Sequence, residues 1–316
     1  MSNAAKSVLI TGGAGFIGSN LVRYLNEKHP AISVRVLDDL SMGRLANLDG
    51  RVVDFTEGSI LDEETLQRVV DGVDSIVHLA ALGSVPRSIA APRPSHEANI
   101  TGTLNVLEAA RRGGVKSVIV ASSSAVYGSN PRLPKTETDW TRPLSPYGVT
   151  KLATESYAIA YNRSYGMTNL ALRFFNVYGP LQPADHVYAA VIPRFIDAML
   201  AGRALTVHGD GLQSRDFTFV DTVCAVLAKA ATQAITSDDP VNLAFGTNTT
   251  LIDVVECLSK ISGLDVVLDH EEPRTGDVRA SHGDPTRIRQ LFPEVEPVPI
   301  DVGLARTLDW FRGKSV

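Results

Sequence analysis

Short, almost continuously apolar runs alternate along the chain with longer stretches whose apolar residues recur every three or four positions. The run Ser7–Thr11 leads through glycines into an amphipathic stretch, Phe16–Glu27, which predicts a strand, a tight turn and a helix. The same alternation predicts further strands at Val34–Leu37, Ser75–Leu79, Ser117–Ala121 and Leu170–Phe174, and further helices at Leu61–Val70, Asn99–Arg112 and Pro146–Tyr165. Apolar strands that alternate with helices are typical of a parallel sheet covered on both faces, so we expect a doubly wound α/β fold.

The pattern changes after Arg173, where the alternation weakens and connections rich in proline and glycine appear at residues 179–183 and 208–211. Residues 216–231 and 240–244 again resemble helix and strand, so we expect them to extend the large sheet. The expected organisation is a large domain over residues 1–173, completed by 216–246, and a smaller C-terminal substrate-binding region over 174–215 and 247–316.

Three glycines follow the first predicted strand, namely Gly12, Gly15 and Gly18 in ITGGAGFIGSN. Glycine permits a tight turn and lets backbone N–H groups approach a pyrophosphate, whose charge the amino terminus of the next helix stabilises. Asp38 lies about 20 residues beyond the last glycine, at the end of the second predicted strand, where a carboxylate binds the ribose 2′-hydroxyl of NAD. A simple turn aspartate is the alternative. The pattern predicts a Rossmann-type sheet whose large domain binds NAD rather than NADP.

Tyr147 and Lys151 in PYGVTK are four residues apart, so a helix places both side chains on one face. They follow the run VASSSAVYG, whose Ser122, Ser123 and Ser124 come at the carboxyl end of a predicted strand, the edge where open α/β sheets bind ligands. A free tyrosine has a pKa near 10, which a nearby ammonium and a nicotinamide cation would lower, while a serine hydroxyl orients the reacting oxygen. These residues in this order predict an acid/base site beside the nucleotide.

Composition excludes several other classes of protein. The 316 residues are 44% hydrophobic and carry 30 Lys and Arg against 35 Asp and Glu, so neither nucleic acid nor an anionic membrane is expected as a partner. Cys224 and Cys257 are far apart and lack metal-ligand spacing, which indicates buried thiols rather than a disulfide framework or a metal site. Because no signal-peptide pattern or membrane-spanning apolar run is visible, we expect a cytoplasmic protein.

These motifs together resemble the extended short-chain dehydrogenase/reductases, and within them the UDP-hexose 4-epimerases, over nearly the whole chain. The resemblance implies NAD as cofactor, a UDP-sugar as substrate, and a homodimer formed by the helices around residues 99–112 and 146–165. It assigns catalysis to Ser123, Tyr147 and Lys151, and implies that Asn99 supports the active-site helix. The cofactor contacts that it implies are Gly12, Gly15, Phe16, Ile17, Gly18, Asp38, Asp39, Ser41, Gly43, Ser59, Ile60, Leu79, Ala80, Ala81, Asn99, Tyr147, Lys151 and Phe174. Ser59 stands where many relatives have an aspartate that contacts adenine, so the adenine contact is expected to differ.

The same resemblance implies a substrate site built largely from the C-terminal half. Arg215 in QSRDF and Arg274 in PRTGDVR resemble the arginines that clamp the UDP diphosphate, a task suited to the planar guanidinium fork. Asp277 resembles the acid that contacts the uridine ribose. The full set of implied substrate contacts is Gly83, Ser84, Ser123, Ser124, Tyr147, Asn176, Ala190, Val191, His208, Arg215, Arg274, Asp277 and Ser281.

Two features of the sequence limit which reaction and which sugar substrate are expected. Dehydratases and decarboxylases of this superfamily carry an acidic residue just after the catalytic hydroxyl, whereas Ser124 and Ala125 stand there, which disfavours elimination. Ser281 occupies the place beside the sugar C2 substituent, and a small residue there resembles the subgroup that accepts UDP-N-acetylhexosamines; an ordinary loop serine is the alternative.

We therefore expect an NAD-dependent UDP-sugar 4-epimerase that acts on UDP-glucose/galactose, UDP-GlcNAc/GalNAc or both, through a transient 4-keto intermediate. One alternative is another nucleotide-sugar enzyme of the same family, such as a UDP-uronate epimerase, a dehydratase or a reductase. A non-catalytic NAD(H) sensor is the alternative from a different class of protein.

Overall fold

A parallel sheet forms the centre of the computed structural model, which describes residues 6–185, 189–272 and 279–314. Its seven strands lie in the order β11-β6-β5-β4-β1-β2-β3, and every neighbouring pair is parallel. The strands are β1 (Ser7–Thr11), β2 (Ser33–Asp38), β3 (Asp54–Glu57), β4 (Ser75–His78), β5 (Ser117–Ser123), β6 (Leu170–Phe174) and β11 (Val241–Leu243). The predicted α/β fold with a doubly wound parallel sheet is confirmed.

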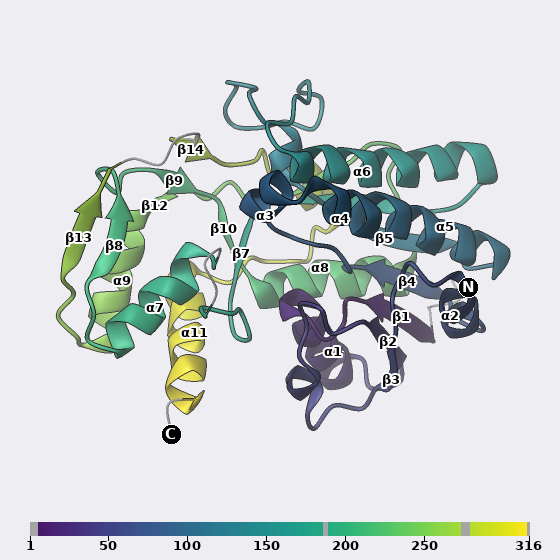
Figure 1. The fold of residues 1–316 in the computed structure, drawn as a ribbon, viewed down its shortest axis with the longest axis horizontal. Helices are drawn as coiled ribbons and strands as arrows, with labels where there is room; N and C mark the ends of the chain where they lie inside the picture. The colour runs from purple at the N-terminus through teal and green to yellow at the C-terminus, as the bar shows by residue number, and fades with distance from the viewer. Residues whose placement is uncertain (1–5, 186–188, 273–278, 315–316) are drawn as a thin grey trace.

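Helices cover both faces of this sheet. Figure 1 shows α5 (Gly102–Arg112) and α6 (Pro146–Tyr165) on one side, with α1 (Phe16–Lys28) and α8 (Val220–Gln233) on the other. Strand side chains alternate between the two resulting cores: Val8 and Ile10 pack on the α1 side, whereas Leu9 packs on the side that also holds α2 (Glu63–Val70). Because both faces are buried, the strands need apolar residues at nearly every position, which explains their continuous hydrophobic runs.

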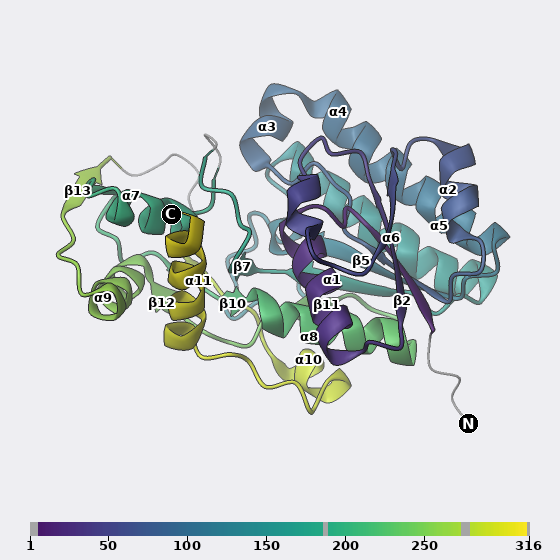
Figure 2. The same cartoon turned by 90° about the horizontal axis from the view of Figure 1, so that it is seen from below.

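Beyond the carboxyl ends of the strands lies a second group of elements, built from short sheets and helices (Figure 1). Its sheets pair β7 (Asn176–Tyr178) with β10 (Phe217–Phe219), β8 (Leu205–His208) with β13 (Leu268–Glu271), and β9 (Ser214–Arg215) with both β12 (Thr249–Thr250) and β14 (Ala280–Ser281). Its helices are α7 (Val191–Leu200), α9 (Leu251–Ser262) and α11 (Ile300–Lys314). Figure 2 shows α10 (Thr286–Leu291) beside the larger layer, near α8.

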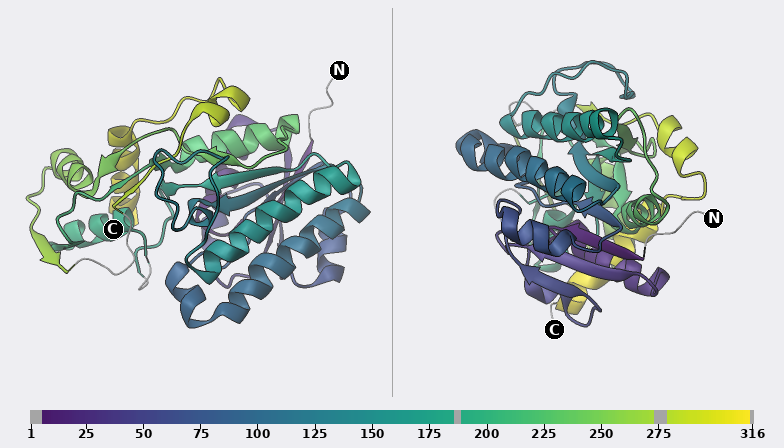
Figure 3. Two further views of the ribbon diagram at one scale, coloured as in Figure 1. Left: turned by 90° about the horizontal axis from the view of Figure 1, so that it is seen from above. Right: turned by 90° about the vertical axis from the view of Figure 1, so that its right-hand side faces the viewer.

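Short helical segments connect β4 to α5. They are α3 (Val85–Ala90), α4 (Pro92–His96) and the π-helical turn η2 (Glu97–Thr101), which continues directly into α5. Figure 3 shows this run lying alongside α6. Two 3-10 turns, η1 (Leu45–Leu48) and η3 (Ser124–Val126), follow β2 and β5. Single π-helical turns often occur at functional sites, and η2 carries Asn99.

Several predicted elements have the expected bounds, whereas others differ for identifiable reasons. β1, β6 and α6 begin and end at the predicted residues. β3 was not predicted because it is an edge strand paired only with β2, and its sequence DFTE is mostly polar. Residues 240–244 contain β11, which forms the edge of the large sheet beside β6. Within 216–231, helix α8 begins at Val220 and packs on this sheet, whereas the short strand β10 before it pairs with β7 in a separate sheet. None of the helices in the described part of the chain is long and apolar enough to cross a membrane.

Candidate active site

The chain order reverses between β1 and β4, because β2 and β3 lie on one side of β1 and the later strands lie on the other. Such a switch point leaves a crevice at the carboxyl ends of the strands, where open α/β sheets bind their ligands. A cavity of about 310 Å³ lies there, and residues that follow β1, β2, β3 and β4 line it. The strand order therefore brings together the glycine turn and Asp38, which are predicted to bind NAD.

The glycine turn at this edge has no room for side chains. Gly12 adopts a φ of +73°, and a Cβ atom there would lie 2.6 Å from the backbone nitrogen of Ala80. A Cβ atom on Gly18 would lie 2.3 Å from the carbonyl oxygen of Gly12. Helix α1 begins at Phe16, next to this turn, and its first backbone N–H groups have no partner inside the helix. A tight, side-chain-free turn before free N–H groups fits a pyrophosphate.

Asp38 is positioned by the backbone at the end of β2. Its carboxylate accepts hydrogen bonds from the backbone N–H groups of Ala14 and Leu40, both at 2.9 Å, and the side chain lines the cavity. Burial raises the pKa of Asp38, and the two backbone hydrogen bonds oppose that rise. The remaining lone pairs of this carboxylate can accept from ribose hydroxyls, as the prediction of NAD requires.

Most of the predicted cofactor residues line the cavity, but not all of them do. Those at its wall are Gly12, Gly15, Asp38, Asp39, Ser41, Gly43, Ser59, Ile60, Leu79, Ala80 and Ala81. Phe16, Ile17, Gly18, Asn99, Tyr147, Lys151 and Phe174 lie outside its lining. Sequence reasoning missed Leu37 near the end of β2, and it missed residues that reach the wall from loops and short helices without a recognisable motif: Met42, Gly58, Leu61, Leu82, Pro94, Glu97 and Ala98. The position of the glycine turn and Asp38 at this cavity fits a dinucleotide.

Asn99 supports the site rather than lining the cavity. Its side-chain amide donates to the Thr150 hydroxyl at 2.9 Å, and its amide oxygen accepts from the backbone N–H of Leu82 at 2.8 Å. Asn99 therefore ties the cavity wall to α6. Next to it, His78 is buried between the hydroxyls of Thr11 and Thr103, and burial lowers its pKa to about 3, so it is the neutral core histidine that its apolar strand indicates.

The three predicted catalytic residues meet where β5 ends against the first turns of α6. Ser145 caps α6 by accepting from the backbone N–H of Gly148 at 3.1 Å, which fixes the turn that carries Tyr147. The Lys151 ammonium lies 5.9 Å from the centre of the Tyr147 ring and donates to the carbonyl oxygen of Ala121 at 2.7 Å. The Ser123 hydroxyl lies near enough to the Tyr147 phenol to influence its pKa.

Burial dominates the ionisation of this pair. Burial raises the pKa of Tyr147, and interaction with the Ser123 hydroxyl lowers it by less. Burial also lowers the pKa of Lys151 to about 8, so the ammonium is still mostly protonated at neutral pH. The side chains of Lys151 and Ser123 alone do not lower the pKa of Tyr147, because desolvation disfavours the phenolate. Forming the phenolate requires additional positive charge, of the kind that a nicotinamide cation supplies.

The short sheet β12-β9-β14 brings two predicted substrate residues side by side. Arg215 on β9 pairs with Ser281 on β14, and the backbone N–H of Asp216 donates to the Ser281 carbonyl at 2.9 Å. The fully buried Asp216 carboxylate accepts from the backbone N–H groups of Gly246 at 3.0 Å and Gly283 at 3.4 Å. Sequence reasoning missed Asp216, although its position within QSRDF offered a signal.

The other predicted substrate residues are spread over the facing elements. Asn176 begins β7 and donates to the carbonyl of Asp216 at 3.4 Å, while His208 ends β8, 3.4 Å from the Glu271 carboxylate. The rest occupy starts of elements or loops: Gly83 with open space around it, Ser84 as the cap of α3, Ser124 at the start of η3, and Ala190 and Val191 at the start of α7. Arg274 and Asp277 lie outside the described residues.

Comparison with known proteins agrees with this arrangement. The family model "NAD dependent epimerase/dehydratase family" matches residues 8–244. The UDP-glucose 4-epimerase of Mycolicibacterium smegmatis is 35% identical over 314 residues, which cover 97% of this chain and 99% of that protein. Among solved structures, the UDP-N-acetylglucosamine 4-epimerase from Methanobrevibacter ruminantium M1 in complex with UDP-N-acetylmuramic acid has a TM-score of 0.91 at 34% identity, covering 98% of this chain and 99% of its own. The UDP-glucose 4-epimerase from Thermotoga maritima with UDP-glucose has a TM-score of 0.90 at 37% identity, covering 98% and 100%.

Other relatives at similar identity are dTDP-glucose 4,6-dehydratases, and some related structures contain NAD. The family match covers well over half of the chain, and the relatives align along nearly all of it. Both the resemblance derived from the sequence motifs and the expectation of NAD as cofactor are therefore confirmed. The chain belongs to the NAD-dependent epimerase/dehydratase family of enzymes.

Proposed function

We propose that this enzyme is a UDP-sugar 4-epimerase. The observation that carries the proposal is the meeting of Ser123, Tyr147 and Lys151 at the sheet edge that also holds the dinucleotide cavity. We assign NAD binding to residues 1–173 and 216–246, and UDP-sugar binding to 174–215 and 247–316. The elements that carry Arg215 and Ser281 lie on the side of the large sheet where its strands end, so a sugar held there can reach the nicotinamide.

Each catalytic residue has one task in this reaction. Tyr147, as phenolate, removes the proton from the sugar 4-hydroxyl and later returns it, while Ser123 hydrogen-bonds the same oxygen. Lys151 holds its positive charge next to the phenol and favours the phenolate. Gly12, Gly15 and Asp38 would hold NAD, which would supply a reversible hydride acceptor for C4. Arg215 anchors the diphosphate while the 4-keto sugar rotates, so the hydride returns to the opposite face and the configuration at C4 is inverted.

The main rival is a different nucleotide-sugar reaction on the same scaffold, since dehydratases are among the relatives. Elimination needs an acid that moves protons at neighbouring sugar carbons, and Ser124 and Ala125 follow the catalytic serine in this chain. A UDP-uronate epimerase is distinguished by its substrate. A reductase is distinguished by its reduction of a ketone. A non-catalytic NAD(H) sensor would not need the Tyr147 and Lys151 pair, because placing the Lys151 ammonium in the interior is costly.

Tyr147→Phe removes the acid/base and leaves the ring. We expect the variant to fold and to retain NAD, but to lose at least about 100-fold in the rate of C4 inversion, the size typical of a positioned proton-transfer group. Rates with UDP-glucose and UDP-N-acetylglucosamine by NMR, and the NAD content of denatured protein, provide the measurement. Tyr157→Phe makes the same change on the same helix outside the site and should leave the rate within about twofold. A rate of C4 inversion close to that of the parent enzyme in the Tyr147 variant would contradict the mechanism.

Ser281→Tyr tests whether this position selects the sugar. The parent enzyme should accept both UDP-glucose and UDP-N-acetylglucosamine, because a small side chain leaves room for an N-acetyl group. A tyrosine ring should lower kcat/KM for the N-acetylated sugar about 5- to 150-fold more than for the hexose, as overpacking of about 1–3 kcal/mol predicts. Ser281→Ala keeps the space and serves as the control. Equal losses for both sugars, or a parent that rejects the N-acetylated one, would refute this specificity assignment.

We also propose a homodimer formed by α5 and α6. These helices lie side by side on the outer face of the sheet, and α6 leaves Val149 and Tyr165 exposed at 51% and 54%. Apolar side chains on a helix face are commonly covered by a second copy in symmetric dimers. Light scattering at micromolar concentration should give twice the mass of one chain, and Val149→Glu should shift it towards the monomer. A monomeric parent protein contradicts the proposal.

A further inference from the structure

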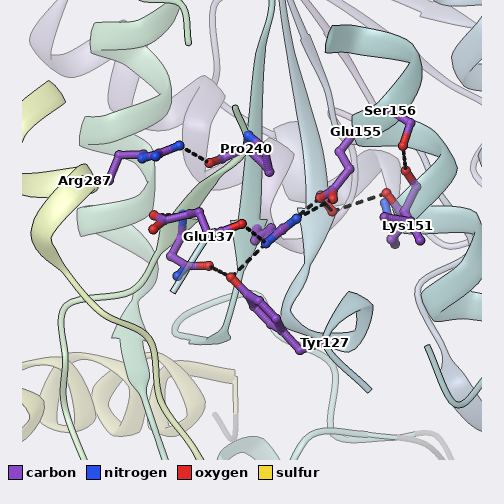
Figure 4. Close-up of polar contacts among 11 residues, drawn as sticks. Tyr127, Glu137, Lys151, Glu155, Ser156, Pro240 and Arg287 are labelled. Atoms are coloured by element: carbon purple, nitrogen blue, oxygen red, sulfur yellow. Dashed lines mark hydrogen bonds and ion pairs between the residues drawn. The ribbon is translucent and has the colours of Figure 1, made fainter. Parts of the chain in front are cut away.

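A buried ion pair lies beneath the candidate active site. The Arg173 guanidinium on β6 and the Glu155 carboxylate on α6 are 4% and 3% exposed. Two parallel hydrogen bonds join them, Nη2 to Oε1 at 2.7 Å and Nε to Oε2 at 3.0 Å. Figure 4 shows Glu155 extending from its helix, with dashed lines marking its polar contacts. The geometry is the bidentate fork that makes arginine and carboxylate pairs directional.

A third side chain extends the pair towards the catalytic residues. The Ser122 hydroxyl lies 2.7 Å from Oε2 of Glu155 and 3.3 Å from the carbonyl oxygen of Lys151, and it is itself 2% exposed. Ser122 directly precedes Ser123 on β5, and Glu155 lies one helical turn after Lys151 on α6. One buried hydroxyl therefore connects the strand that carries the catalytic serine to the helix that carries the catalytic lysine.

The far side of the arginine is fixed as well. Nη1 of Arg173 donates to the Tyr127 hydroxyl at 2.9 Å, and that hydroxyl donates to the Asn242 amide oxygen at 2.6 Å. Burial raises the pKa of Tyr127 to about 12, so its hydroxyl stays neutral at physiological pH and remains a donor to Asn242. The guanidinium thus has a partner on each of its three nitrogens, and it cannot turn without losing one of them.

Stability alone does not explain an ion pair at this depth. Taking two charges out of water costs free energy, and apolar residues of similar volume are often at least as stable in such places. Each member of the network is, however, next to a residue of the site: Ser122 precedes Ser123, Arg173 precedes Phe174, and Glu155 follows Lys151 by one turn. A directional pair fixes positions in a way that apolar packing does not.

We propose that Glu155 and Arg173 form a positioning pair for the active site, which acts through Ser122 to hold the end of β5 against the turn of α6 that carries Lys151. The inference rests on the proposed roles of Ser123, Tyr147 and Lys151. Neither Glu155 nor Arg173 lines the cofactor cavity, so the pair acts through the catalytic groups that it positions.

The consequence of breaking the pair concerns Tyr147. Burial raises the pKa of Tyr147, and interaction with the Ser123 hydroxyl opposes that rise. When β5 and α6 separate at this end, that interaction weakens while burial largely persists. The pKa of Tyr147 should therefore rise, and less phenolate is available at a given pH.

The test compares Glu155→Gln, Ser122→Ala and the double variant with the parent holoenzyme. We expect kcat to fall about 10- to 100-fold in Glu155→Gln and about 5-fold or more in Ser122→Ala, with KM within about threefold, because ground-state binding is not touched. The double variant should lose no more than Glu155→Gln alone, since both changes break one connection. The pKa of Tyr147, followed by fluorine NMR of 3-fluorotyrosine-labelled protein and assigned with Tyr147→Phe, should rise by about half a pH unit or more.

Asn169→Ala is the matched control. The Asn169 side chain joins the same two elements at the opposite end of β5, accepting from the backbone N–H of Val118 at 3.1 Å and donating to the carbonyl of Ala158 at 3.1 Å. We expect this variant to lower the melting temperature and leave the pKa of Tyr147 and kcat nearly unchanged. The comparison separates general loosening of β5 and α6 from loss of position at the site.

Two results would overturn the proposal. One is a Glu155→Gln variant that behaves like the Asn169 variant, with a lower melting temperature and an unchanged pKa of Tyr147. The other is a purely additive effect of Ser122→Ala and Glu155→Gln on kcat. If Glu155→Gln does not fold, the kcat and the Tyr147 pKa of Ser122→Ala, which leaves the ion pair intact, test the proposal. If the parent turns over no UDP-sugar, the proposed function fails, yet the fluorine titration still tests the positioning role.

Discussion

The site depends first on the parallel pairing of β1 with β2 on one side and with β4 on the other. Parallel strands end at the same edge of a sheet, and the reversal of chain order at β1 opens the crevice at that edge. The glycine turn, Asp38 and the cavity wall after β4 come together for this reason alone. The next strand, β5, then places its serines beside the same crevice. Loss of this pairing would scatter residues that are far apart in the sequence.

The second requirement is that buried polar groups at this edge find partners. Asp38 is held by backbone N–H groups, Asp216 by backbone groups of two different loops, and Glu155 by Arg173 and Ser122. A buried carboxylate without such partners would be strongly destabilising. The same contacts that satisfy these groups also set the separation of strands, helices and loops. Stability and catalytic geometry are therefore supplied by one set of interactions.

Sequence reasoning predicted the layered fold because local pattern determines it. The apolar run of β1 and the period of α6 need no knowledge of their neighbours. The edge strand β3 was not predicted, because its polar sequence has no hydrophobic pattern typical of a strand. Roles that depend on contacts with residues distant in sequence were also not predicted. Asp216 and Glu155 look like ordinary acidic residues in the sequence, because only the fold brings their partners to them. Asn99 was expected both at the cofactor and as a support of the active-site helix; its amide contacts Leu82 and, on α6, Thr150, as the second expectation requires.

In the proposed reaction, C4 of the sugar is oxidised and reduced again within one binding event. UDP-glucose deuterated at C4 follows that hydrogen directly, and NMR and mass spectrometry locate it in the product. The proposed mechanism predicts that UDP-glucose is converted to its galacto epimer, with deuterium still at C4 and no solvent hydrogen at C3 or C5. Migration of deuterium to another carbon, solvent exchange beside C4, or release of a ketone with stoichiometric NADH would contradict it.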